Sequence, residues 1–110
     1  MNVRFRREAA AEFLALPARE QAALTSALRK LEAVGEALAF PHSSAVRGAS
    51  AALRELRPRQ GRSRWRAFYR RLGDDLVIAA IGPEAAVDAR GFGRAVEAAV
   101  ARLADEEEGV

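Results

Sequence analysis

The order of apolar and polar residues at the start of the chain changes from a strand-like to a helix-like pattern. Val3 and Phe5 fall on one side of an extended stretch, which predicts a strand over residues 2–5. From Arg7 onward, apolar residues recur every three or four positions and gather on one side of a helix. Pro17 lacks the backbone N–H that continues a helix, so this first helix ends or bends there.

A second helix is predicted over residues 18–34, where leucine, alanine and valine again recur at helical spacing. Pro17 suits its first turn, because the missing N–H would have no partner there. Gly35 suits the C-terminal cap. Two amphipathic helices joined at a proline form a helical hairpin, whose apolar stripes must be buried on another element.

The middle of the chain reads as a connection that leads into a strand. Residues 37–50 contain a proline, a glycine and turn-forming polar residues, which predicts a connection. A strand is predicted over residues 53–57. Leu53 and Leu56 are three positions apart, so either this strand has a bulge or one leucine faces the second side of the sheet.

Two further strands are predicted over residues 64–70 and 76–81, after a turn at 58–63 and before Gly82 and Pro83. The first alternates, with one set of side chains on the packing side and another opposite: Trp65, Ala67 and Tyr69, against Arg64, Arg66, Phe68 and Arg70. The second is a continuous apolar run, which is typical of a central strand covered on both faces.

Helical spacing returns from about Val87 and predicts a C-terminal helix. Residues 105–108 are all acidic and lie where the helix dipole disfavours negative charge, so we expect fraying and a disordered acidic tail from about residue 105. The order is strand, helical hairpin, three antiparallel strands and helix. It predicts one α+β domain over residues 1–110, with the helices gathered on one face of a small sheet.

Positive charge is concentrated in residues 54–71, which contain eight arginines and one acid, Glu55, and so carry a net charge of +7. The whole chain carries +3, so the remainder is net acidic. A guanidinium presents a planar fork of donors that suits phosphate oxygens, and the segment therefore points to a polyanion, first of all RNA or DNA. A solvated charged hairpin that binds nothing is the alternative.

Composition argues against several other classes of protein. The chain has no cysteine and a single histidine, His42, so we expect no disulfide, no metal site and no cofactor. No apolar run approaches the roughly 20 residues of a membrane span, and the first residues lack the apolar core of a signal peptide. We therefore expect a cytoplasmic protein with no membrane partner.

Four stretches, in this order of elements, resemble the RelE/HigB toxins of type II toxin–antitoxin systems, in particular the phage-protein-like HigB branch of the RelE/ParE superfamily. They are FPHSSAVRG (40–48), LRELR (53–57), GRSRWRAFYRR (61–71) and DDLVIAAIG (74–82). The resemblance implies a RelE-like fold and a metal-independent endoribonuclease, an mRNA interferase that cuts mRNA on the ribosome and inhibits translation. It also implies a cognate antitoxin as partner, typically a HigA-like helix-turn-helix protein.

The resemblance also implies a set of site residues. RNA cleavage by the 2′-hydroxyl needs that hydroxyl deprotonated, the phosphorane stabilised and the leaving 5′-oxygen protonated. Arg57 and Arg66 match family arginines and are expected to clamp the scissile phosphate, unless they are ordinary strand arginines. His42 and Glu55 are the candidates for proton transfer; a structural histidine and a glutamate that neutralises arginines are the alternatives. Further arginines are expected to contact RNA: Arg54, Arg59, Arg62, Arg64 and Arg90.

The chain departs from the family after its last strand, where the family carries a basic cluster. Pro83 and Glu84 stand there instead, and the nearest arginines are Arg90 and Arg94. Three functions therefore stay open: a ribosome-dependent nuclease with a weakened or relocated site, a degenerate non-cleaving member that still binds its antitoxin, and a ParE-like inhibitor of DNA gyrase.

Overall fold

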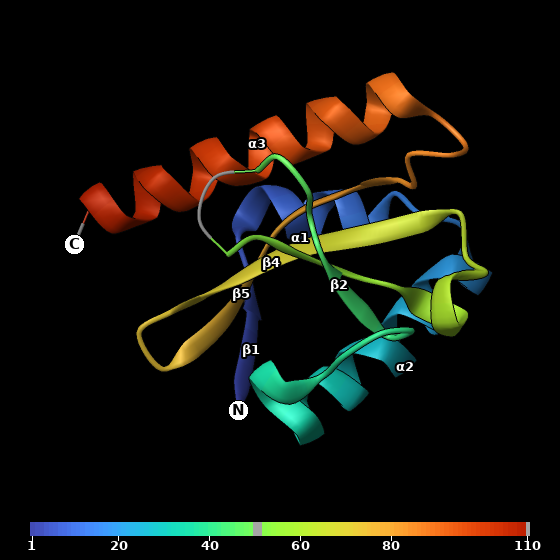
Figure 1. The fold of residues 1–110 in the computed structure, drawn as a ribbon, viewed down its shortest axis with the longest axis horizontal. Coiled ribbons are helices and arrows are strands. Elements are labelled where there is room, and N and C mark those ends of the chain that lie inside the picture. The colour runs from blue at the N-terminus through green and yellow to red at the C-terminus, as the bar shows by residue number, and fades with distance from the viewer. Residues whose placement is uncertain (50–51, 110) are drawn as a thin grey trace.

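A five-stranded sheet forms the centre of the computed structural model, which describes residues 1–49 and 52–109 (Figure 1). Ser50, the last residue of the predicted connection, lies outside the described residues. The elements in chain order are β1 (Asn2–Phe5), α1 (Arg7–Leu14), α2 (Ala18–Val34), the 3-10 helix η1 (Gly35–Ala37), β2 (Ser43–Ala45), β3 (Arg54–Leu56), the 3-10 helix η2 (Pro58–Gly61), β4 (Trp65–Leu72), β5 (Asp75–Pro83) and α3 (Ala89–Glu108). The predicted α+β class is confirmed.

The strand order is β1-β5-β4-β3-β2, and only the β1–β5 pairing is parallel among the described strands. In Figure 1 the blue β1 lies beside β5, with Val3 opposite Leu76. The three predicted antiparallel strands are therefore the middle of a larger sheet. The predicted connection also contains a short edge strand, β2, which pairs Ser43 with Leu56 of β3.

The helices cover both faces of the sheet, so the expectation that they gather on one face was wrong. Tyr69 and Ile78 pack in one core cluster with α1 and α2, whereas Phe68 and Val77 pack in a second cluster with α3. Since β4 and β5 are apolar on both sides, each face needs its own cover of helix. None of the described helices is long and apolar enough to cross a membrane.

The two leucines around β3 separate between these clusters. Leu53 packs on the α3 side and Leu56 on the α1–α2 side, which confirms that one of them faces the second side of the sheet. The register irregularity lies elsewhere, between Phe68 and Tyr69 of β4.

The acidic end of α3 is helical through Glu108, in contrast to the fraying and disorder expected from about residue 105. Arginines of the neighbouring strands compensate the charge that the helix dipole disfavours. Glu106 binds Arg4 of β1, and Glu107 binds Arg70 of β4. Val110 lies outside the described residues.

Gly82 sets how closely α3 approaches the sheet. A Cβ built at this position would lie 2.4 Å from the Cβ of Ala95 in α3, which is far inside van der Waals contact. Glycine in β5 and alanine in α3 together permit the close packing of the two elements.

Candidate nucleic-acid interface

The loop that connects β3 to β4, residues 57–64, has an unusual backbone. Residues 59–61 all have left-handed φ angles, of 56°, 59° and 93°, and only the third is glycine. Non-glycine residues adopt this conformation at a cost, so the surroundings must hold it. Pro58 is buried at the start of the loop, and the hydroxyl of Ser63 donates to Glu20 of α2 at 2.7 Å. Loop 57–64 is thus anchored to α2, while most of its polar side chains are exposed to solvent.

A groove of about 380 Å³ lies between α2 and loop 57–64. We call it the cationic groove, because six of its lining residues are basic: Arg19, Lys30, His42, Arg57, Arg59 and Arg62. None of the described residues that line it is acidic; the others are alanine, serine, glutamine and leucine. Small side chains on this face of α2 leave room for a ligand, and the summed positive charge favours an anionic one.

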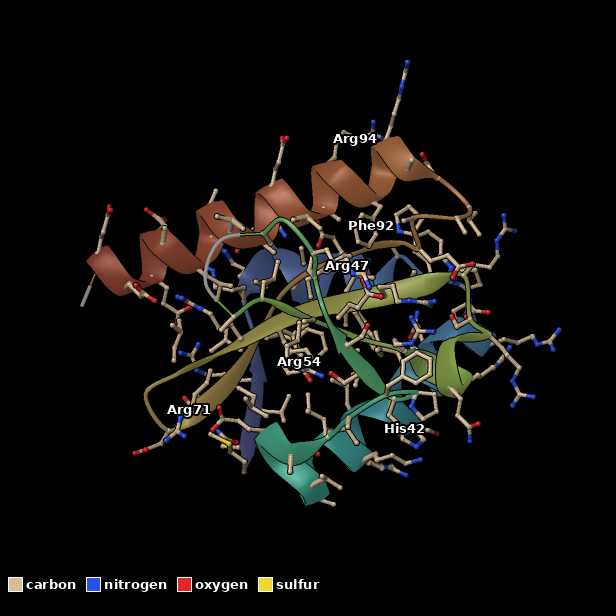
Figure 2. All side chains as sticks on the ribbon, in the orientation of Figure 1. His42, Arg47, Arg54, Arg71, Phe92 and Arg94 are labelled. Carbon is tan, nitrogen blue, oxygen red and sulfur yellow. The ribbon has the colours of Figure 1, made fainter. Side chains whose placement is uncertain are left out.

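A second, wider groove of about 1210 Å³ shares Arg19, Arg59 and Arg62 with the first. Its floor includes Trp65 and Ile81, and its walls carry acids as well as Arg64 and Arg94. Figure 2 shows His42 next to α2 and Arg94 on α3. The lining of the wide groove therefore mixes charges, whereas the described lining of the cationic groove contains no acid.

Arg66 is buried, with only 2% of its surface exposed. Its Nη1 donates to the carbonyls of Ser63 and Trp65 at 2.7 and 2.9 Å. Its Nη2 donates to the carboxylate of Glu84 at 2.6 Å and to the carbonyl of Gly61 at 3.2 Å. Burial lowers the pKa of Arg66, whereas the carboxylate of Glu84 favours the charged form. In this structure the guanidinium holds loop 57–64, and its donors face the protein.

Arg57 and Arg66 meet at the same carboxylate. Arg57 Nη1 lies 3.3 Å and Arg66 Nε 3.6 Å from Oε1 of Glu55, which also accepts a hydrogen bond from Ser44. Arg57 is further fixed by donating from Nε to the carbonyl of Pro41 at 3.1 Å. The structure thus brings together three of the predicted site residues, with Glu55 neutralising the two arginines.

His42 lies on the groove side of Arg57. The backbone N–H of Arg57 donates to the His42 carbonyl at 2.8 Å, and both residues line the cationic groove. His42 is half-buried. Its imidazole can therefore meet a ligand in the groove, next to the Arg57 guanidinium.

Arg54 lies on the opposite face of the sheet from Glu55. Its Nε donates to the hydroxyl of Ser43 at 3.0 Å, and that hydroxyl is 2.6 Å from the hydroxyl of Tyr69. Tyr69 is buried, so packing rather than base stacking describes it. Arg54 belongs to this internal network and is not among the described lining residues of either groove.

The remaining arginines predicted to bind RNA are dispersed. Arg59 and Arg62 are exposed and border both grooves, whereas Arg64 borders only the wide one. Arg90 is exposed in the first turn of α3, outside the described lining of both. Two of the five are therefore in the cationic groove. Within the described ranges, no group of three His, Cys, Asp or Glu side chains is placed to hold a metal ion.

Four residues of the site were missed by sequence reasoning. Arg19 and Lys30 come from α2, where they lie three turns apart on one face together with Ser26. This helix face, with two cations, a serine and otherwise only alanines, was a usable signal. Phe40, whose ring lies 5.0 Å from the guanidinium carbon of Arg57, gave no signal. Glu84 gave none for its pairing with Arg66, because the two residues are distant in the sequence.

One comparison with known proteins gives a match. The sequence model of a family described as phage derived protein Gp49-like (DUF891) matches residues 11–82. The matched range begins within α1 and ends at Gly82, one residue before the end of β5, and it includes loop 57–64 and all the described lining of the cationic groove. No curated protein and no solved structure matches the chain.

Proposed function

The chain belongs to the Gp49-like family of phage-derived proteins, and on this basis we propose that it is the toxin of a type II toxin–antitoxin system that cleaves mRNA on the ribosome. The family is RelE/HigB-like and is associated with the toxins of such systems, which suggests an antitoxin partner. The cationic groove is the observation that carries the nuclease proposal. Its six basic residues and acid-free described lining suit the backbone of an mRNA in the cytoplasm.

The residues of the groove have different roles in the proposed reaction. Arg57 is the arginine that can stabilise the pentacoordinate phosphorus, because it is a fifth exposed and borders the groove. His42, beside it, supplies one proton transfer: it accepts the proton of the attacking 2′-hydroxyl or donates one to the leaving 5′-oxygen. The 2′-oxygen then bonds to phosphorus and the bond to the 5′-oxygen breaks, with solvent water taking or giving the second proton. Arg66 and Glu55 act through Arg57 as positioning residues.

The contacts of two glutamates in the site support a second candidate, a non-cleaving member of the family that retains only antitoxin binding. Glu84 stands where a basic cluster is expected and pairs with Arg66 at 2.6 Å. Glu55, the other candidate for proton transfer, is engaged by Ser44 and Arg57. An acidic segment of a helix-turn-helix antitoxin would complement the cationic groove in either case and would block phosphate access.

Primer extension on mRNA from a reconstituted translation reaction tests the nuclease proposal. We expect cleavage by the wild type, its loss in Arg57→Ala and a strong reduction in His42→Ala. Arg29→Ala is the matched control, since Arg29 is exposed on α2 and is not among the described lining of the groove. Intact mRNA with folded wild-type protein would reject the nuclease and leave the antitoxin-binding member, which a pull-down of the adjacent gene product would then test.

A further inference from the structure

Phe40 differs from every other aromatic residue of the chain. The chain has five phenylalanines, one tryptophan and one tyrosine, and all except Phe40 pack in or against the two core clusters. Phe40 is 71% exposed. A lone exposed apolar side chain is common, so exposure alone assigns nothing to it.

The contact of Phe40 with Arg57 shows which face of the ring is covered and which is exposed. The guanidinium carbon of Arg57 lies over the ring, 5.0 Å from its centroid. Arg57 covers one face of the ring, and at 71% exposure the other face is open to solvent. A cation over one face of an aromatic ring is a favourable arrangement, and it leaves the second face available for stacking.

The ring is held by a rigid support. Arg57 is fixed by the carbonyl of Pro41 and by Glu55. It also packs closely on Gly61, where an added Cβ would lie 2.4 Å from Arg57 Nη2. Because little side-chain freedom remains to be lost, binding on the open face of Phe40 costs little ordering entropy.

The cationic groove adjoins this ring directly, since Arg57 belongs to both and His42 follows two residues after Phe40. Single-stranded nucleic acids are bound by just these two elements, a positive groove for phosphates and an aromatic face for a base. We propose that a nucleobase of single-stranded RNA stacks on the open face of Phe40 while its neighbouring phosphates lie in the cationic groove. The inference rests on the proposed RNA substrate, but it does not require cleavage.

The test uses the full chain and a 2′-O-methyl RNA hexamer that contains 2-aminopurine, which cannot be cut by 2′-hydroxyl attack and whose fluorescence is quenched by stacking. At about 50 mM salt we expect the wild type to bind and quench this probe. Phe40→Ala should weaken binding about 5- to 150-fold, which is the range for losing one base–aromatic stack, and should abolish the quench. Phe40→Trp should retain both.

Two controls separate stacking from other causes. Phe40→Leu keeps apolar area without a π face and should behave like Phe40→Ala. Leu14→Ala removes an equally exposed apolar side chain, at 70%, from α1 and should behave like the wild type. All four variants change one of two exposed side chains, Phe40 or Leu14, so circular dichroism should show native folding.

Three results would overturn the inference: no binding by the wild type, full binding and quenching by Phe40→Ala, or wild-type behaviour of Phe40→Leu. The second result would assign Phe40 to a protein contact instead. Quenching without mRNA cleavage in the translation assay would reject the nuclease and retain the stacking site, whereas cleavage without quenching would reject the stacking site alone.

Discussion

Replacing Arg66 by alanine tests whether this buried arginine holds the loop that forms the groove. The guanidinium donates to three backbone carbonyls between residues 61 and 65 and to the carboxylate of Glu84. Arg66→Ala removes all these donors at once. The three carbonyls then lose these hydrogen bonds next to the cavity that the missing side chain leaves, and Glu84 loses its counter-ion.

The expected loss follows from the burial of the pair. Removing one partner of a buried ion pair costs about 3–5 kcal/mol of unfolding free energy. The side chain of Glu84 is 27% exposed, so water compensates part of its charge and the lower end of that range applies, about 3 kcal/mol. A domain of this size has about 5–15 kcal/mol in total, so the variant should be clearly destabilised. Arg66→Lys keeps the charge but not the planar fork and should lose about half as much.

The unfolding free energy is measured by urea unfolding, followed by the fluorescence of Trp65, which is the only tryptophan and the neighbour of Arg66 in the sequence. Arg64→Ala is the control, because Arg64 is exposed, and it should change the unfolding free energy by less than about 0.5 kcal/mol. A loss below about 1 kcal/mol in Arg66→Ala, at an unchanged denaturant slope, would show that Arg66 does not support the loop. If Arg66→Ala does not fold, Arg66→Lys supplies the comparison.

Three further predictions concern the packing, the groove and the N-terminal strand. Gly82→Ala should lower the unfolding free energy by about 1–3 kcal/mol in thermal unfolding, because its Cβ would meet an α3 side chain at 2.4 Å; an unchanged melting temperature would contradict the close approach. Arg62→Ala should reduce the slope of log Kd against log salt for single-stranded RNA by about 0.7 without loss of stability, and an unaltered slope would place Arg62 outside the interface. Hydrogen bonds from Asn2 and Arg4 lower the pKa of Asp75, so the stability that ionised Asp75 contributes is present above about pH 4 and is lost as the pH falls through the lowered pKa. Asp75→Asn should therefore make the melting temperature fall less steeply at acid pH. An unchanged acid dependence would argue against these hydrogen bonds.

Local patterns predicted most of the elements of the fold. Alternation in β4 placed Tyr69 and Phe68 on opposite faces, and the structure confirms it. The edge strand at Ser43 was missed because its residues have little strand propensity and become a strand only by pairing with β3. The second layer of helix could have been expected from the continuous apolar run of β5, which needs cover on both sides.

The candidate site was predictable only in part. The concentration of arginine pointed to the region of Arg57, Arg59 and Arg62, and these residues do line the cationic groove. Charge counting cannot tell an exposed arginine from a buried one, however. Arg66 is buried because Glu84, 18 positions away, supplies its partner, and that pairing exists only in the folded chain.

Mapping RNA contacts on the folded protein tests the central claim most directly. Amide chemical shifts of the ¹⁵N-labelled chain would be followed during titration with a non-cleavable single-stranded RNA at low salt. We expect the shifts to concentrate on the groove-facing side of α2, on residues 40–42 and on loop 57–64. Shifts confined to the C-terminal half of α3, or none with folded protein, would contradict the assignment of the cationic groove as the RNA-binding surface.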